Sequence, residues 1–368
     1  MDFKFELAAP QDDPALRRLL ATNAMPGSIA VTFEREPDYF LGCSTMGRFW
    51  QVLIGRDVHN GDLGAVLCRA TQPRWVNGEV REVGYLGQLR VDAPYRGRWV
   101  LQQGIDALHT LHQDGRATHY LSAIADENRV ALGVLVEHPR PSFPTMRQVA
   151  HLHTLGIILG RPRPTQRSPY QIERGSAETL PEIVAFLHEW GARRQFFPAY
   201  AAADFDEAEY ATLRDFRVDD FVVARQHGEI AGVTGLWDQK GYKQTVVQGY
   251  GGALRWLRPL YNLGAPLLGI QPLPGIGEQI KSAYASLICV QNDDPEVFRA
   301  LLRRVYNLAA GRGYAHLMLG LDERDPLLPV AEAYPHIAYL SRLFLAHWPE
   351  ALDLDLDDRL PYIEIAAL

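Results

Sequence analysis

Two arginines flank a glycine where a helix is expected to begin. Residues 90–112 read RVDAPYRGRWVLQQGIDALHTLH, and Arg96, Gly97 and Arg98 stand between a strand-like run and a helix-like run. A helix start carries unpaired backbone N–H groups and the positive end of the dipole, so it favours anions. Glycine lets a ligand come close, and guanidinium groups pair with phosphate oxygens. The stretch predicts a phosphate or pyrophosphate site, with a solvated basic turn as the alternative.

Histidines and carboxylates elsewhere do not form a recognisable metal motif. His109 and His112 lie three apart on the expected helix, without a nearby cysteine or carboxylate to complete a ligand set. His151 and His153 alternate along an expected strand, which favours a strand face. We therefore predict no metal. Residues 353–358 (DLDLDD) are interpreted as an acidic turn before a last strand at 361–368.

Composition limits the class of protein. The chain has 368 residues, 47% of them hydrophobic, which is enough for about two domains. The net charge of -7 argues against a broad nucleic-acid surface. Three scattered cysteines, the absence of a signal-peptide pattern and apolar stretches broken by Gly and Pro predict a soluble cytoplasmic protein with no membrane partner.

The two halves of the chain resemble each other. A Pro- and Arg-rich stretch, residues 159–170, is typical of a linker, and a strand–loop–helix pattern restarts after it. The start of each half aligns at an offset of 167 residues, as Glu6/Glu173, Pro14/Pro181 and Leu20/Leu187. Residues 114–132 match 310–328 at an offset of 196. We predict a tandem repeat of one fold.

Each half is expected to run strand, helix, several strands, helix, strand, helix, strand. The middle strands are expected at FWQVLIGRD, LGAVLCRAT and EVGYLGQLRV in the first half, and at DFVVARQ, IAGVTGLWD and ASLICV in the second. Strands mixed with helices in this order predict an α/β or α+β fold with a mixed sheet.

The first half resembles the Gcn5-related N-acetyltransferase superfamily. GYLGQLRVDAPYRGRWVLQQGIDAL is similar to that family's fourth strand, pyrophosphate loop and third helix, and YLSAIADENRVALGVLVEH to its fifth strand and next helix. The resemblance covers most of residues 3–160 and is weaker afterwards. It implies two tandem acetyltransferase-like domains, each a splayed mixed β-sheet flanked by helices: 1–160 with the acyl-CoA site, a linker at 161–170, and a degenerate second domain at 171–368.

The resemblance assigns the donor contacts. Leu89 and Val91 would offer backbone groups to the pantetheine arm, and Asn128 would also contact it. The pyrophosphate would be held by Arg96, Gly97 and Arg98 with the N–H groups of Trp99 and Val100. The donor would be acetyl-CoA or another acyl-CoA.

Two departures from the family pattern affect the chemistry. Trp99, Val100 and Leu101 stand where the family has small residues in the loop, and Leu135 replaces a tyrosine general acid. Amine acylation still needs a route for the proton of the amine. Tyr85, which could order a water, and Ser122 are weak candidates, with strand packing as the alternative.

The second half has carboxylates where an anion would bind. Its matching loop, VQNDDPEVFRALL, contains Asp293, Asp294 and Glu296. A close like-charge contact with phosphate costs about 1 kcal/mol even in water. We therefore expect the donor in the first half alone, with the second half covering it or shaping the acceptor pocket.

Three functions remain open at this point. The first is an acyl-CoA-dependent N-acyltransferase, with acetyl transfer to a small-molecule amine. The second is a catalytically silent coenzyme A sensor, and the third is a synthase of long-chain N-acyl amino acids. Residues 26–40, which include Phe33, Glu34, Arg35, Tyr39 and Phe40, are the expected acceptor region. The sequence leaves the oligomeric state open.

Overall fold

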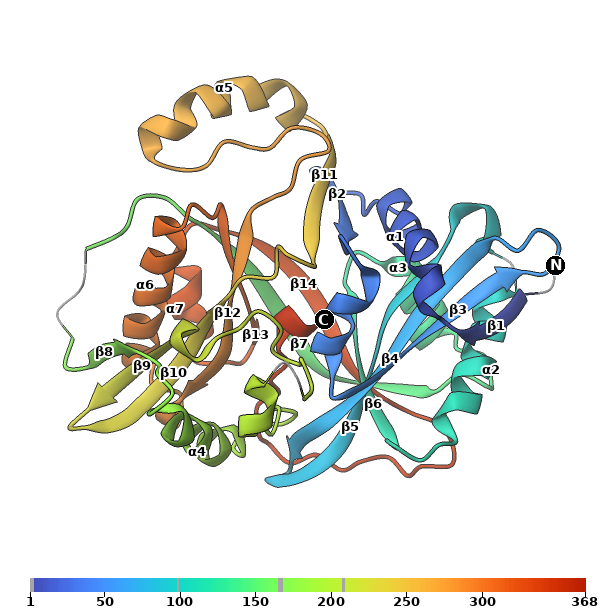
Figure 1. Cartoon of the computed structure of the whole chain (residues 1–368), viewed down its shortest axis with the longest axis horizontal. Helices are drawn as coiled ribbons and strands as arrows, with labels where there is room; N and C mark the ends of the chain where they lie inside the picture. The colour runs from blue at the N-terminus through green and yellow to red at the C-terminus, as the bar shows by residue number, and fades with distance from the viewer. Residues whose placement is uncertain (1–2, 98, 165–167, 207–208) are drawn as a thin grey trace.

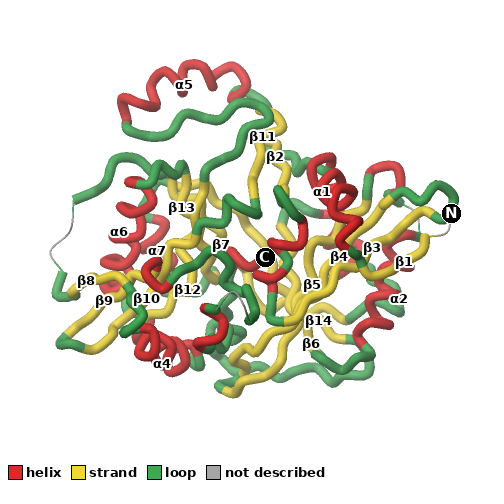
Figure 2. The backbone as a smooth tube through the Cα atoms, viewed as in Figure 1, coloured by secondary structure: helices red, strands yellow, loops and turns green. Residues whose placement is uncertain are grey.

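Twelve strands of the described residues form one mixed sheet that runs through the molecule. The computed structural model describes residues 3–97, 99–164, 168–206 and 209–368. Strand order in the sheet is β1-β3-β4-β5-β6-β14-β7-β13-β12-β10-β9-β8. Figure 1 shows the two halves of the chain side by side, and Figure 2 shows the helices around the strands.

The helices and strands of the first half lie close to the expected positions. They are β1 (Phe3–Leu7), α1 (Asp13–Thr22), β2 (Ile29–Glu34), β3 (Phe49–Asp57), β4 (Leu63–Val76), β5 (Glu79–Val91), α2 (Val100–His112), β6 (His119–Ala125), α3 (Arg129–Leu132) and β7 (Thr145–Ile158). The three middle strands include all the residues that the sequence pattern assigned to them.

The second half repeats this order with one insertion. Its elements are β8 (Gln171–Arg174), α4 (Leu180–Gly191), β9 (Phe221–Gln226), β10 (Glu229–Trp237), β11 (Gln244–Tyr250), α5 (Leu254–Leu268), β12 (Ser282–Val290), α6 (Pro295–Gly311), β13 (His316–Asp322), α7 (Leu328–Glu332) and β14 (His336–His347). The insertion comprises β11 and α5, and β2 has no counterpart in the second half. Apart from these elements, the halves share one strand order in the sheet, β1-β3-β4-β5-β6 and β8-β9-β10-β12-β13.

The last strand of each half pairs with a strand of the other half. Strand β14 pairs antiparallel with β6, from Ser341↔Ala125 to His347↔His119. Strand β7 pairs antiparallel with β13, and β7 and β14 also pair with each other at the centre of the sheet. The exchange joins the two half-sheets into one. Whether residue 160 is a domain boundary stays a prediction.

Alternating side chains place helices on both faces of the first half-sheet. Val52 and Ile54 on β3 pack in one buried cluster with residues of α1, whereas Leu53 packs in another with Ile105 and Leu108 of α2. This follows from the two-residue period of a strand and the three-to-four-residue period of a helix. The buried face of α2 fixes the direction in which its first turn points.

A two-stranded sheet carries helix α5 away from the body. Strand β11 pairs antiparallel with β2, and α5 follows on this stem at the top of Figure 1. Its outer face is apolar and exposed: Trp256, Leu260, Leu263 and Leu267 are each more than 65% exposed. Among the described residues, we find no helix with the length and apolar character required to cross a membrane.

The expectation of a last strand at residues 361–368 is wrong. Pro361 forms only an isolated bridge to Gln195, and Ile365–Ala367 is a single turn of 3-10 helix. The segment PYIEIAAL is apolar because it is buried between the halves, where Tyr362 and Ile363 are each no more than 6% exposed. Its backbone contacts are with the second half.

Candidate donor site between diverging strands

Strands β5 and β6 pair only briefly before they separate. The two parallel strands are in register at Gly84↔Tyr120 and Tyr85↔Leu121 alone. Beyond this point, no strand among the described residues pairs with the backbone groups that face the gap. A gap between the carboxyl ends of parallel strands is a common ligand site in open α/β sheets.

A β-bulge directs β5 away from β6. Gln88 has φ of 57°, and the register with β4 shifts between Val66 and Cys68. A bulge bends its strand and increases the twist. The same feature recurs in the second half, where Leu287 has φ of 52° and the register of β10 with β12 shifts between Val233 and Gly235. Both halves therefore contain the splay that the resemblance implied.

Helix α2 begins beside this gap without a side-chain cap. The loop after β5 is anchored by Tyr95, whose ring packs edge-on against Phe3 with 5.0 Å between ring centroids. Gly97 has φ of 73°, a conformation that favours glycine. Among the described residues, the N-cap residue Trp99 makes no side-chain hydrogen bond to the helix. The first backbone N–H groups of α2 are therefore suited to donate hydrogen bonds to a bound anion.

Of the predicted phosphate-binding arginines, the structure describes Arg96, in the loop before this helix start. Arg96 donates to the side-chain oxygen of Asn23 at 2.6 Å and to the carbonyl of Val91 at 3.0 Å. These bonds tie the loop to the end of α1 and use the Val91 carbonyl. Arg90 donates to the Leu89 carbonyl at 2.9 Å. Arg98 lies outside the described residues.

Arg140 is a further cation at the helix start, and sequence reasoning missed it. Its guanidinium lies 4.0 Å from the centre of the exposed Trp99 ring and donates to Gln102 at 3.2 Å. Stacking of this kind orients both groups. Arg140 comes from the segment between α3 and β7, so only the fold brings it here. The Trp99 ring thus holds the Arg140 guanidinium beside the helix start.

Asn128 caps the helix that follows β6. Its side-chain oxygen accepts from the N–H of Ala131 at 3.1 Å, and the residue is exposed. This bond fixes the turn between β6 and α3. The predicted contact of Asn128 with pantetheine stays a prediction.

The two weak catalytic candidates do not face each other. Tyr85 is buried in the same cluster as Leu121, whereas Ser122 is the next residue along β6 and so points to the opposite face. Burial raises the pKa of Tyr85 to about 12. The phenol is therefore protonated at neutral pH and is a poor base.

A buried polar cluster lies on the Tyr85 face, within the expected acceptor region. Arg35 is 3% exposed and donates to the Cys43 sulfur at 3.0 Å. Its guanidinium lies 4.9 Å from the centre of the Tyr39 ring, and the Tyr39 hydroxyl is 3.3 Å from the Cys68 sulfur. The sequence signalled Arg35 and Tyr39 by their mixture with aromatic residues, but not the cysteines.

The second half contributes a lysine to this cluster. Lys243 donates to the carbonyl of Ala366 at 2.8 Å and to the main-chain oxygen of Leu368 at 3.2 Å. Burial, and then the charge of Arg35, hold the pKa of Lys243 well below its usual range. The region around Arg35 is thus built by both halves.

In the second half the corresponding helix start is already occupied. Asp294 caps α6 by accepting from the N–H of Glu296 at 2.8 Å. Asp293 pairs with Arg194, which also donates to Asp325 at 2.6 Å and so links the loops that follow β12 and β13. The positive charge of Arg194 is already paired with these two carboxylates, so it is not available to bind a phosphate.

The gap beside β12 is also filled. The N–H of Leu287 donates to Glu364 at 2.8 Å, and the N–H of Ile288 donates to the Tyr362 hydroxyl at 3.3 Å. These backbone groups correspond to those that β5 presents to its own gap. The segment that sequence analysis took for a strand thus satisfies the backbone groups of β12.

The arrangement matches known structures across nearly the whole chain. A GCN5-related glucosamine N-acetyltransferase region of a fungal multi-domain β-N-acetylglucosaminidase has a TM-score of 0.60 and 15% identity. The match covers 94% of this chain and 38% of that one. The chain has the GCN5-related N-acetyltransferase fold. No protein-family model and no curated protein matches the sequence.

Two further structures with this fold match over most of their own length. A GCN5-related N-acetyltransferase from Sphaerobacter thermophilus has a TM-score of 0.56 and 14% identity, with 96% of this chain and 98% of that chain covered. N-myristoyltransferase from Saccharomyces cerevisiae, solved with bound myristoyl-CoA, has a TM-score of 0.60 and 11% identity, with 94% and 82% covered. The acetyltransferase-like fold that the resemblance implied is confirmed.

Proposed function

We propose that the protein is an acyl-CoA-dependent N-acyltransferase that binds its donor in the first half and acylates a small-molecule amine. The observation that carries the proposal is the uncapped start of α2 beside the diverging β5–β6 pair. A dipole end, free N–H groups and nearby arginines together form a pyrophosphate site. The gap between the strands gives the pantetheine arm backbone groups to bind.

The acceptor is proposed to bind near Arg35, on the face of the sheet that carries Tyr85. Residues of both halves meet there, so the second half would shape the pocket rather than hold a second donor. Lys243 is the group in this region best suited to take the proton of the amine, because its lowered pKa makes the neutral amine accessible. Direct attack on the thioester with proton release to water remains compatible with this site.

Donor binding is tested by calorimetry with coenzyme A and point variants. We expect Arg98→Glu to weaken binding at least tenfold and Arg96→Ala to weaken it less, because reversal adds repulsion to the loss of a donor. Arg304→Glu is the matched control, since Arg304 is exposed on α6 in the other half. Unchanged affinity in both loop variants would contradict the proposed donor site.

Activity is tested by thiol release with acetyl-CoA and myristoyl-CoA against a panel of amines. Release above background with any amine establishes the enzyme and shows which acyl chain it prefers. Donor binding without turnover for every amine would favour the coenzyme A sensor instead. The substitutions at Trp99 and Leu135 are the sequence features that motivate this second function.

A further inference from the structure

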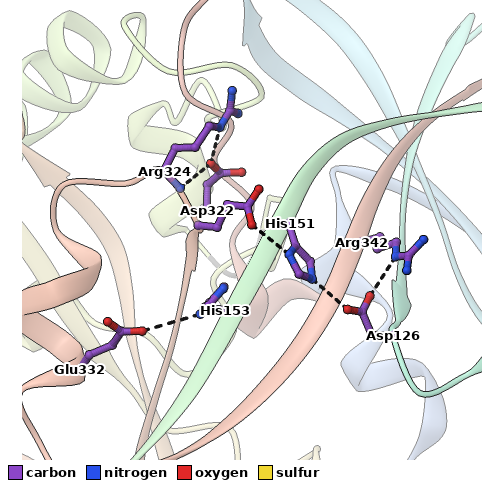
Figure 3. Close-up of polar contacts among 8 residues, drawn as sticks. Asp126, His151, His153, Asp322, Arg324, Glu332 and Arg342 are labelled. Carbon is purple, nitrogen blue, oxygen red and sulfur yellow. Dashed lines mark hydrogen bonds and ion pairs between the residues drawn. The ribbon is translucent and has the colours of Figure 1, made fainter.

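Two histidines and a glutamate meet at the centre of the sheet, outside the proposed donor site. His151 and His153 lie on β7 with 5.8 Å between their ring centroids, and Glu323 directly follows β13. One ligand atom from each of the three lies within 4.8 Å of the other two. Figure 3 shows the contact of His151 with Asp126 and that of Asp126 with Arg342.

The two nitrogens of His151 have different partners. Nδ1 is 3.1 Å from the Glu323 carboxylate, and Nε2 is 2.9 Å from the Asp126 carboxylate. Asp126 in turn accepts from Arg342 at 3.0 Å. A carboxylate on the far nitrogen of a histidine is the usual outer partner of a metal-bound imidazole, because it fixes the ring and raises its basicity.

The backbone holds Glu323 against β7. Its N–H donates to the carbonyl of His151 at 2.9 Å, so the two residues keep a fixed spacing. The next residue, Arg324, donates to Asp322 at 2.8 Å and stabilises the turn. The position of the carboxylate is therefore set by the fold, although its side chain is 52% exposed and can rotate.

The local charges leave room for a divalent cation. Arg342 is paired with Asp126, and Arg324 is paired with Asp322. Glu332, at the end of α7, lies 3.8 Å from His153 Nδ1 and adds a carboxylate beside that ring. Neutral imidazoles add no charge, so Glu323 alone balances half the charge of a divalent ion, and a second carboxylate would balance it fully.

This ligand set specifies the class of metal. Imidazole and carboxylate ligands suit Zn²⁺ and similar divalent transition metals, which bind nitrogen and oxygen at about 2.0–2.2 Å. Ligand atoms around such an ion lie about 3.3 Å apart. The three atoms now lie within 4.8 Å of one another, so binding would require Glu323 to rotate and the rings to shift closer.

We infer that His151, His153 and Glu323 form a binding site for Zn²⁺ or a similar divalent transition metal, with Asp126 as the outer partner of His151. The ion would link β7 of the first half to the β13–α7 turn of the second. Through Asp126 it would also steady the turn that contains Asn128. Sequence spacing predicted no metal because Glu323 lies 172 residues beyond His151.

The experiment uses the full chain without an affinity tag, freed of metal by chelation. Calorimetric titration with Zn²⁺ should show one equivalent, and Co²⁺ should give visible d–d absorption typical of histidine ligation. Glu323→Gln and His153→Gln should each weaken Zn²⁺ binding more than tenfold. Asp126→Asn should weaken it about ten- to hundredfold, as expected for an outer partner.

His59→Gln is the matched control, because His59 lies in an exposed turn between β3 and β4. Its Zn²⁺ affinity should equal that of the wild type. Glu323 is exposed enough for its substitution to leave the fold intact, which circular dichroism verifies. Wild-type affinity in both Glu323→Gln and His153→Gln, or no binding to the wild type, would overturn the inference.

Discussion

Tyr85 sits where β5 and β6 separate, which makes its hydroxyl an obvious candidate for proton transfer. Burial raises its pKa to about 12, so the phenol stays neutral throughout the range from pH 6 to 9. A group that does not titrate in this range cannot shape the pH profile there. Position alone therefore does not make Tyr85 a base.

We predict that Tyr85→Phe changes kcat by less than about threefold and leaves the pH–rate profile between pH 6 and 9 unmoved, since a proton-transfer group contributes about 10²–10⁴-fold. Tyr284→Phe is a matched control, because Tyr284 precedes the β12 bulge as Tyr85 precedes the β5 bulge and burial also raises its pKa to about 12. Steady-state kinetics with the amine found by screening measure both variants. A hundredfold loss in Tyr85→Phe alone would assign proton transfer to this residue.

The cluster around Arg35 shows the limit of residue-level inference from sequence. The sequence marked residues 26–40 as the expected acceptor region only by their mixture of charged and aromatic residues, and that role stays a prediction. Cys43 and Cys68 were interpreted as scattered, yet both are buried near Arg35 and Tyr39. Lys243 joins them from the other half. Such contacts depend on strand positions that a local pattern does not encode.

At the level of elements, periodicity predicted most of the fold. The helices α2 and α6 and the six middle strands follow from apolar spacing because each has one face against a core. Residues 361–368 have the same apolar character for another reason, since they are inserted between the halves. The position of Arg140 beside the start of α2 could not be predicted either, because Arg140 is distant from the loop in sequence.

The two helix starts after β5 and β12 differ in what already binds them. The start of α2 has no side-chain cap among the described residues, whereas α6 is capped by Asp294 and its loop is paired with Arg194. Dipole strength is similar in both, so the side chains decide which start accepts a phosphate. This difference in side chains favours the first half as the donor site.

Neutralising the acidic loop should therefore leave donor binding almost unchanged. In the triple variant Asp293→Asn, Asp294→Asn and Glu296→Gln, we expect the Kd for coenzyme A to stay within about twofold and the stoichiometry to remain one per chain. Stability should fall by about 1 kcal/mol, because Arg194 loses a charged partner and the first turn of α6 loses its carboxylates, whereas an Asn side-chain oxygen can still cap the helix. Calorimetry and thermal unfolding measure the two effects. A second binding event, or tighter binding in the triple variant, would show that the second half is a donor site.

At the scale of the whole molecule, the exchange of β7 and β14 does more than the linker to hold the two halves together. Each half-sheet ends with a strand that belongs to the other half in sequence, and these two strands pair with each other along their length. Removing either half would leave β6 or β13 as an unpaired edge in the middle of a buried sheet, which is costly. The repeat was visible in the sequence, but the exchange was not, because β7 and β14 have the same pattern whichever neighbour they join.

The exchange predicts that the chain can be cut between its halves without coming apart. A protease site inserted between Arg163 and Ser168 interrupts the connection from β7 to β8 while leaving every strand pair of the sheet in place. We expect the two fragments to elute together in size-exclusion chromatography and to keep the coenzyme A affinity of the intact chain. The uncut variant, with the site inserted, is the control for the insertion itself. Fragments that separate under native conditions, each with its own folded circular dichroism spectrum, would mean that the strands are not exchanged as the structure shows. Joint elution with loss of donor binding would mean instead that the connection positions the loop after β5.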